Sequence, residues 1–284
     1  MADEDSAEEE LFGEDFASAL DGAGAPGGGG AAGDGGSDEP FETTQGDGDF
    51  ESAVPRVQVG IEGLDNMIEG GVPDRSLVTT IGSAGTGKTT FGLQFLERGL
   101  AAGERAVYLS LEERRDDILT TAEEKGWPFR EYAAEGDLAV VDFDPVEMAN
   151  SLTSIGDELP ALIDEFGATR VVLDSVSLLE MMYEDQATRR MEVYDFSRAL
   201  KRAGVTTVLT SEADSANPFR SRYGIIEHLT DAVFLLRYLR SEDFRETRLV
   251  VEIQKIRNAN HSRETKPYEI TDEGISVYRQ ANLF

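Results

Sequence analysis

A glycine-rich segment at residues 82–89, Gly-Ser-Ala-Gly-Thr-Gly-Lys-Thr, matches the pattern G-x-x-x-x-G-K-[ST] in full. The preceding residues 77–81, Leu-Val-Thr-Thr-Ile, have the composition of a buried strand, and residues 90–96 space their apolar side chains as a helix does. This strand–loop–helix context distinguishes a phosphate-binding loop from a chance match. The alternative interpretation is a glycine-rich turn followed by a solvated lysine.

The backbone of such a loop carries most of its chemistry. Glycines at 82, 85 and 87 permit conformations that direct successive N–H groups at one point, and the next helix aims its positive end at the same point. Lys88 would bridge the β- and γ-phosphates, and the Thr89 hydroxyl would ligate Mg²⁺. We therefore expect a polyphosphate to contact Gly82, Ser83, Ala84, Gly85, Thr86, Gly87, Lys88, Thr89 and Thr90.

Acidic residues end two other predicted strands. Asp174 ends a Walker B-like strand, where its carboxylate would lie near Thr89 and hold Mg²⁺ directly or through water. Glu112 and Glu113 end another strand, where a carboxylate can hold and deprotonate the water that attacks a γ-phosphate. Adjacent strand residues point to opposite sides, so only one Glu can face the nucleotide well. A solvated charge pair at the start of a helix would have the same sequence.

A further candidate site lies at the end of the predicted strand 248–257. Alternate residues of a strand share one face, and here an apolar stripe ends in two cations, Lys255 and Arg257. Such a pair could supply charge to a transferring phosphoryl group, as an arginine finger does. Ordinary surface cations at a strand end would show the same pattern, so the residues alone leave both interpretations open.

Strands and helices alternate after the phosphate loop, which predicts an α/β fold. Strands are predicted at 106–111, 138–143, 171–174 and 205–210, and helices at 115–125, 149–166 and 188–202. Pro160 could divide the second of these helices. Continuous apolar strands separated by helices predict a mostly parallel sheet covered on both faces. Segments 232–238, 248–257 and 275–278 follow with short connections and predict an antiparallel C-terminal extension.

Composition divides the chain. Residues 1–55 hold sixteen Asp or Glu, twelve Gly and no Lys or Arg, so they cannot bury enough apolar surface to offset the entropy of ordering. We interpret them as a disordered tail, and residues 56–284 as one globular domain. Within the tail, residues 11–16 (Leu-Phe-Gly-Glu-Asp-Phe) could fold on a protein partner. The alternative is a tail that only increases solubility.

Charge and cysteine content limit the partners and the compartment. Of the formal net charge of −30, the tail accounts for −16 and the remainder for −14, which argues against a nucleic-acid partner. The acid excess, together with five Lys against twenty-one Arg and no Cys, suggests a very salty cytoplasm. At molar salt the Debye length is about 3 Å, so the carboxylates would not repel one another strongly. Equal thermal stability in low and high potassium chloride would contradict this hypothesis.

Membrane association is not expected from this sequence. No apolar run approaches the roughly 20 residues that span a bilayer, and the N-terminus lacks a basic, hydrophobic signal. Without cysteine there are no disulfides or thiolate metal sites. We therefore expect a cytoplasmic protein.

Taken together, these motifs resemble the KaiC-like branch of the RecA superfamily of ATPases over nearly all of residues 57–284. The segments that carry the resemblance occur in the family's order: 59–65 with 70–73 before the loop, then 111–113, 171–175, 210–212, 222–224, 255–257 with His261, and 268–275. The resemblance implies a RecA-like core that forms a hexameric ring with ATP bound between subunits. It also favours Glu112, the first of the acidic pair, as the catalytic base, with Glu113 beside it.

The resemblance implies that each nucleotide site draws on two subunits. One subunit would contribute the phosphate loop, Thr89, Asp174 and Glu112. Its neighbour would contribute a second set of contacts, namely Lys255, Ile256, Arg257, His261 and Asp272.

The sequence also departs from the family. The clock protein that names the family carries two such domains, whereas one is found here. A phosphorylatable Ser-Thr pair of that protein corresponds here to Glu227 and His228, so we expect no autophosphorylation at this place. A Gly-Thr-Ser sequence after the cation pair is replaced by Asn-Ala-Asn at 258–260, which puts some polar nucleotide contacts in doubt.

Three functions follow as hypotheses. The first is an Mg²⁺-dependent ring ATPase of slow turnover with a regulatory or signalling role. The second is a DNA-binding recombinase related to RecA, against which the acid excess and the lack of a helix-hairpin-helix-like segment argue. The third is a nucleotide-gated scaffold without catalysis, whose acidic tail recruits a protein partner.

Overall fold

The computed structural model describes residues 54–150, 152–240 and 247–278. The predicted tail, except for its last two residues, and the aromatic–acidic patch at 11–16 lie outside the described residues, so the predicted domain division stays a prediction. Among the described residues, no helix has the length and apolar character needed to cross a bilayer.

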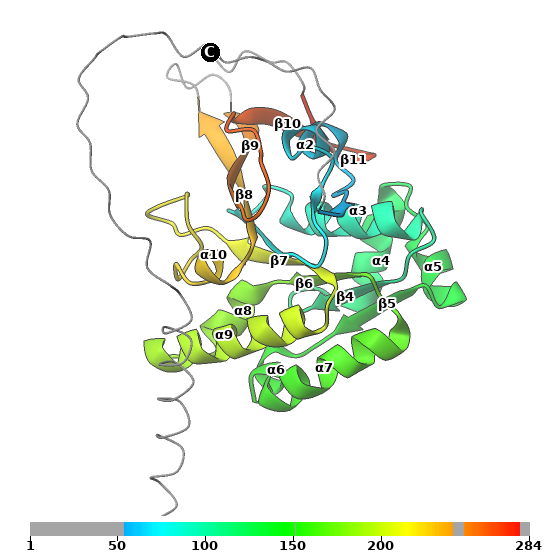
Figure 1. Ribbon diagram of the computed structural model, residues 1–284, viewed down its shortest axis with the longest axis vertical. Helices are drawn as coiled ribbons and strands as arrows, with labels where there is room; N and C mark the ends of the chain where they lie inside the picture. Colours follow the sequence, from blue (N-terminus) through cyan, green and yellow to red (C-terminus); the bar gives the residue numbers. More distant parts are fainter. Residues whose placement is uncertain (1–53, 151, 241–246, 279–284) are drawn as a thin grey trace, which may run out of the picture. The chain divides into compact units, whose positions relative to one another are not determined.

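A nine-stranded sheet forms the centre of the protein, with strand order β11-β10-β9-β8-β3-β7-β6-β4-β5 (Figure 1). Its strands are β3 (Leu77–Gly82), β4 (Ala106–Ser110), β5 (Leu138–Asp142), β6 (Arg170–Asp174), β7 (Thr206–Glu212), β8 (Ala232–Arg240), β9 (Thr247–Ile256), β10 (Lys266–Thr271) and β11 (Gly274–Val277). Two short strands, β1 (Arg56–Val57) and β2 (Val72–Pro73), pair separately in an antiparallel ribbon.

The direction of the strands confirms the predicted fold class. Strands β8, β3, β7, β6, β4 and β5 run parallel, and β9, β10 and β11 add to the β8 edge in antiparallel order. The antiparallel part begins one strand later than predicted, because β8 pairs in parallel with β3. Strand β10 was not among the predicted strands.

Helices cover both faces of the sheet. They are α2 (Glu62–Met67), α3 (Lys88–Leu100), α4 (Arg115–Glu124), α5 (Phe129–Glu135), α6 (Pro145–Asn150), α7 (Leu152–Phe166), α8 (Val176–Met181), α9 (Gln186–Arg202) and α10 (Ile226–Leu229). In Figure 1, α3, α4 and α5 lie on one side of the sheet and α6 to α9 on the other. Within β6, Val172 faces the core shared with α3, α4 and α5, whereas Val171 and Leu173 face a second core shared with α7, α8 and α9.

The predicted helix 149–166 corresponds to two helices, but Pro160 does not divide them. Two helices are present: α6 ends at Asn150, α7 begins at Leu152, and Pro160 lies inside α7. Proline removes one backbone hydrogen bond of a helix. Leu159 and Ile163 on the same helix are buried against the sheet, and this burial offsets the loss.

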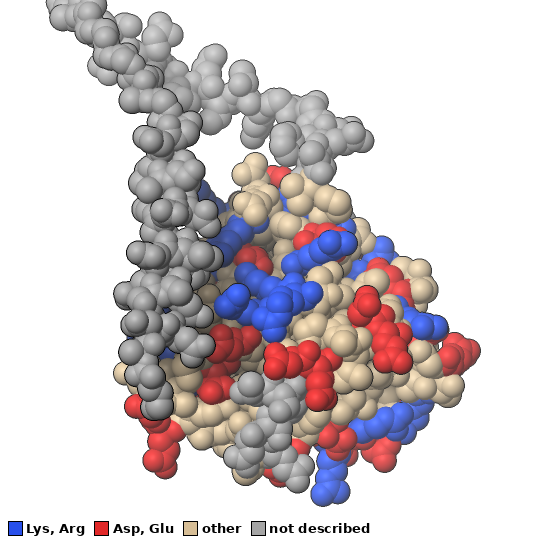
Figure 2. All heavy atoms as spheres, turned by 60° about the horizontal axis from the view of Figure 1, so that its bottom comes forward, with Lys and Arg blue, Asp and Glu red and all other residues tan. Residues whose placement is uncertain are grey.

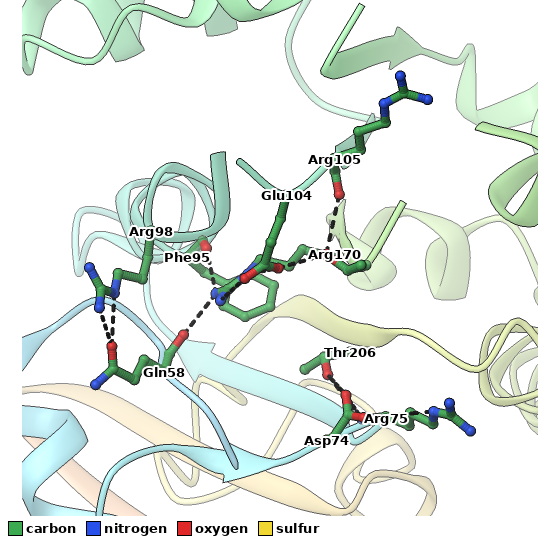
Figure 3. Close-up of polar contacts among 10 residues, drawn as sticks. Gln58, Asp74, Arg75, Phe95, Arg98, Glu104, Arg105, Arg170 and Thr206 are labelled. Carbon is green, nitrogen blue, oxygen red and sulfur yellow. Dashed lines mark hydrogen bonds and ion pairs between the residues drawn. The ribbon is translucent and has the colours of Figure 1, made fainter. Parts of the chain in front are cut away.

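Arg170, at the first position of β6, ties this strand to α3 (Figure 3). The residue is 4% exposed, and its guanidinium pairs with both carboxylate oxygens of Glu104, at 2.8 and 3.1 Å. It also donates to the carbonyl oxygens of Gln58, at 2.7 Å, and Phe95, at 3.0 Å, and stacks on the Phe95 ring. Since Phe95 belongs to α3, this contact fixes α3 and β6 relative to each other from the edge at which β6 begins.

The surface is not uniformly acidic. Figure 2 shows one face on which Lys and Arg side chains gather at the centre, with Asp and Glu side chains around them. Charges of both signs are therefore interspersed on the described part of the chain, despite the net negative charge.

Candidate nucleotide-binding site

The predicted site residues follow strands that end at one edge of the sheet. Strands β3, β4, β6 and β7 are parallel, and the register pairs Gly82 with Glu212 and Ser110 with Asp174. A cavity of about 640 Å³ lies at this edge and is lined by Ala84, Gly85, Gly87, Lys88, Thr89, Thr90, Leu111, Glu112, Asp174, Ser175, Ser177, Leu178, Met181, Glu212 and Ile270. The carboxyl edge of a parallel sheet is where α/β proteins bind their ligands.

The phosphate loop has the backbone geometry that its glycines predict. Gly85 and Gly87 have φ angles of 79° and 85°, in the left-handed region that favours glycine. A Cβ on Gly87 would lie 2.8 Å from the Cδ1 atom of Ile270, so the Ile270 side chain would have to shift to admit it. Helix α3 begins at Lys88, within the last two residues of the loop, so its positive end faces the cavity.

Side-chain contacts hold the loop in place. Lys88 Nζ donates to the Ser83 carbonyl at 3.3 Å, and Thr86 Oγ1 donates to the same oxygen at 2.8 Å. The buried Tyr268 of β10 donates its hydroxyl to the Thr86 carbonyl at 2.6 Å. The cradle is thus fixed both by its own residues and by a strand far away in sequence.

Asp174 is the centre of a network of hydroxyl donors. Thr89 Oγ1 and the Tyr108 hydroxyl each donate to Asp174 Oδ2 at 2.7 Å, and Thr210 Oγ1 donates to Oδ1. Burial, and then the nearby Asp174 carboxylate, raise the pKa of Tyr108 well above its usual value, so the phenol keeps its proton and remains a donor. This arrangement fixes the orientation of the carboxylate relative to Thr89.

The donor set fits a magnesium ion bound together with a nucleotide. Hydroxyl and carboxylate oxygens, as on Thr89 and Asp174, are the hard ligands that Mg²⁺ prefers. Within the described ranges, no group of three or more His, Cys, Asp or Glu could hold a metal by itself. A cation here would depend on phosphate oxygens and water for its other ligands, as is usual for Mg²⁺.

The two adjacent glutamates have different surroundings. Glu112 lines the cavity and accepts a hydrogen bond from Ser175 Oγ at 2.5 Å. Glu113 is not among the lining residues, and its backbone N–H donates to Ser110 Oγ at 3.0 Å. Burial and the neighbouring carboxylates of Asp174 and Glu112 raise the pKa of Glu113. Of the pair, Glu112 is therefore the one placed to contact a ligand in the cavity.

The two predicted cations lie beside the amino-terminal ends of the parallel strands, whereas the phosphate loop lies at their carboxyl-terminal ends. Ile256 is paired with Ala232, which is level with Val78, and Gly82 lies four positions after Val78 in β3. At about 3.3 Å per residue, Ile256 is about 13 Å from the level of the phosphate loop. Neither Lys255 nor Arg257, on either side of Ile256, can span that distance to the cavity of its own chain.

Both cations contact backbone carbonyls of α10. Lys255 Nζ donates to Glu227 O at 2.6 Å, and Arg257 Nη2 donates to His228 O at 3.3 Å. Burial, and then the positive charge of Arg257, lower the pKa of Lys255. Repulsion between the two cations is therefore part of the site.

The other two residues predicted to contact a neighbour's nucleotide, His261 and Asp272, lie in different connections between strands. His261 Nδ1 is 2.9 Å from the Ser262 carbonyl, and the Ser262 N–H donates to the carbonyl oxygen of Met67, the last residue of α2. Asp272 lies in the turn after β10, a strand whose Ile270 lines the cavity. As contacts of a neighbour's nucleotide, His261 and Asp272 therefore stay predictions.

Several residues of the site were not found from the sequence. Tyr108 and Tyr268 support Asp174 and the loop, and Ser175 contacts Glu112. A tyrosine within an apolar strand is a usable signal, because a buried hydroxyl usually requires a partner. That partner cannot be identified without the fold.

Comparison with known proteins agrees with this geometry. The family described as "ATPase: KaiC" matches residues 57–282. Among curated relatives, the circadian clock oscillator protein KaiC of Parathermosynechococcus lividus is 32% identical over 233 residues, covering 79% of this chain and 42% of the relative. The KaiC of Synechococcus elongatus is 32% identical over 244 residues, covering 83% and 46%. The chain thus spans about half the length of these relatives.

A solved structure shows the same fold. The KaiC-like protein from the hyperthermophilic archaeon Pyrococcus horikoshii superposes with a TM-score of 0.70 at 36% sequence identity. The match covers 79% of this chain and 99% of that one.

Proposed function

This chain belongs to the KaiC family of ATPases, and from that premise we propose that it binds ATP with Mg²⁺ and hydrolyses it to ADP and phosphate. We further propose that it works as a subunit of a ring, with a regulatory role. The observation that carries the proposal is the meeting of the phosphate loop, Thr89, Asp174 and Glu112 around one cavity.

Each residue of the cavity has a role in this proposal. The loop amides and Lys88 bind the β- and γ-phosphates, so Lys88 exchanges its contact with Ser83 O for phosphate oxygens. Thr89 and Asp174 hold Mg²⁺, which when bound neutralises charge on the phosphates. Glu112 orients a water and takes its proton as the water oxygen attacks the γ-phosphorus and the bond to ADP breaks.

The position of the cations supports a site shared between subunits. Lys255 and Arg257 cannot reach the cavity of their own chain. Their positive charges could nevertheless stabilise the negative charge of a transferring phosphoryl group. We propose that a neighbour in the ring presents them, together with the other predicted contacts Ile256, His261 and Asp272.

A mixing experiment tests this proposal. We expect phosphate release to be lost in Lys88→Ala, Glu112→Gln and Arg257→Ala. Mixing Lys88→Ala with Arg257→Ala should restore activity, because an intact cavity on one variant can then meet intact cations on the other. In a randomly mixed ring this occurs at about a quarter of the interfaces. The exposed Arg190→Ala on α9 is the matched control and should keep full activity.

The outcomes separate the alternatives. No recovery from mixed variants that fold and assemble would contradict the shared site. Tight ATP binding without phosphate release by the wild type would leave a nucleotide-gated scaffold. Hydrolysis stimulated by DNA at the working salt concentration would favour the recombinase.

Other parts of the proposal come from the sequence or the family resemblance. They are the hexameric size of the ring, the slow turnover, the acidic tail as a binding segment for a protein partner, the cytoplasmic location and the adaptation to high salt.

A further inference from the structure

Asp231 lies directly before β8, and its carboxylate meets two cations and one backbone N–H. Lys201 Nζ, at the end of α9, is 2.8 Å from Asp231 Oδ1, and Arg257 Nη1 is 3.7 Å from the same oxygen. The N–H of Leu77, the first residue of β3, donates to Asp231 Oδ2 at 3.0 Å. One carboxylate thus joins the end of α9, the start of β3 and the residue that follows β9.

The backbone fixes this carboxylate in place. Asp231 N–H donates to Leu77 O at 2.7 Å, and Arg257 N–H donates to Asp231 O at 2.8 Å. The Asp231 side chain is 23% exposed, so its ion pairs are partly shielded from water. The carboxylate is therefore a fixed point between the first residue of β3 and the residue that follows β9.

Three cations surround one acid here, and they do not share it equally. Lys201, Lys255 and Arg257 are close enough that Arg257 and Lys201 both lower the pKa of Lys255. Lys201 takes the short contact with Asp231 Oδ1, and Arg257 stays at the longer distance with half of its side chain exposed. The guanidinium is thus oriented by the carboxylate without being fully neutralised by it.

We propose that Asp231 is the positioning residue of this cation set and that Lys201 is its third member. Asp231 holds Arg257 against the repulsion of its neighbours, so that the guanidinium faces the phosphates bound by the adjoining subunit. Lys201 pairs with the same carboxylate and so weakens its attraction for Arg257. The Arg257 guanidinium can then still bind a phosphate. This inference rests on the proposed function, and Asp231 itself does not touch the nucleotide.

The test uses the full-length ring and two variants. Asp231→Asn keeps an oxygen that can accept from Leu77 N–H but removes the charge that orients Arg257. We expect kcat for phosphate release to fall at least tenfold while the affinity for ATP stays unchanged. Lys201→Gln should also lower kcat, because the carboxylate can then close on Arg257. Lys201 is partly exposed, so this variant is expected to fold even if the other does not.

Mixing distinguishes positioning from a structural role. The Asp231→Asn defect lies in the cations that a subunit presents to its neighbour. Mixing Asp231→Asn with Lys88→Ala should therefore restore phosphate release to the level seen when Arg257→Ala is mixed with Lys88→Ala. A variant that merely weakened the fold would show no such recovery. Asp195→Asn and Arg198→Gln, exposed substitutions on α9, are the charge-matched controls and should behave as wild type.

Each outcome has one meaning. If Arg257→Ala and Lys88→Ala do not recover on mixing, the shared site itself is wrong. If they recover but Asp231→Asn with Lys88→Ala does not, Asp231 is structural and the inference is overturned. Full activity of Asp231→Asn and of Lys201→Gln alone would overturn it equally.

Discussion

The carboxyl group of Glu180 makes the stability of this protein depend on pH. Glu180 lies on α8 with an exposed fraction of 0%, and neither of its carboxylate oxygens has a hydrogen-bond partner among the described residues. Burial, and then the carboxylate of Glu227 on α10, raise its pKa from 4.5 to about 7. The charges of Arg189 on α9 and Arg222 oppose this rise but do not cancel it.

The direction of the pH dependence follows from the number of protons that the folded and unfolded states bind. Between pH 4.5 and 7 the folded protein keeps the Glu180 proton, whereas the unfolded chain has released it. Stability therefore falls as pH rises through this window. A pKa change from 4.5 to about 7 corresponds to about 3 kcal/mol, all of it lost above pH 8. Glu180→Gln cannot ionise, so it should be about 3 kcal/mol more stable than wild type at pH 8 but less than about 1 kcal/mol more stable at pH 5.

Urea unfolding followed by circular dichroism at pH 5, 6, 7 and 8, at one protomer concentration, measures this difference. Glu135→Gln, an exposed substitution on α5, is the control and should change stability little at any pH. A gain from Glu180→Gln that is the same at pH 5 and pH 8 would refute the reasoning. A loss of stability at pH 8 would show that the ionised carboxylate has a favourable partner.

Two further substitutions test the supports of the site. Tyr108→Phe removes one donor to Asp174, and hydrogen bonds to charged groups are worth about 1.5–3 kcal/mol, so the Mg²⁺ concentration for half-maximal phosphate release should rise on the order of tenfold. Tyr132→Phe is its control, and an unchanged Mg²⁺ requirement would contradict the role of Tyr108. Arg170→Met removes a buried guanidinium and leaves the carbonyl oxygens of Gln58 and Phe95 and the partly exposed Glu104 carboxylate without this donor, so it should lower the unfolding free energy by about 1–3 kcal/mol. Arg105→Met, which breaks an exposed pair, should cost less than about 1 kcal/mol, and equal losses would refute the importance of burial.

Local sequence patterns predict the phosphate loop and most strands, because these features depend mainly on residues close together in the chain. The spacing of residues 82–89 is enough to predict the loop, because the turn and the helix start are encoded within a few positions. Most strand positions were predicted within one or two residues, since buried parallel strands are continuous apolar runs. Helix α9 begins two residues earlier than predicted because Asp185 accepts from the Thr188 N–H at 2.7 Å and caps it.

Contacts between distant residues could not be predicted in the same way. Strand β10 contains Pro267 and alternates little, so neither period nor propensity marks it, yet its Tyr268 supports the phosphate loop. The contact between Asp231 and Leu77 joins residues 154 positions apart. No local sequence rule predicts this contact, because it forms only when β8 pairs with β3.

Strand β3 links the two halves of the proposed shared site. It begins at Leu77, which hydrogen-bonds the carboxylate that orients Arg257, and ends at Gly82, where the phosphate loop starts. All six of its residues are buried, and it pairs with β7 on one side and β8 on the other, so its ends move together if they move at all. In a ring, the two ends of this one strand would serve two different ATP molecules. Substitutions at either end can therefore complement each other in a mixed ring, because each damages a different interface.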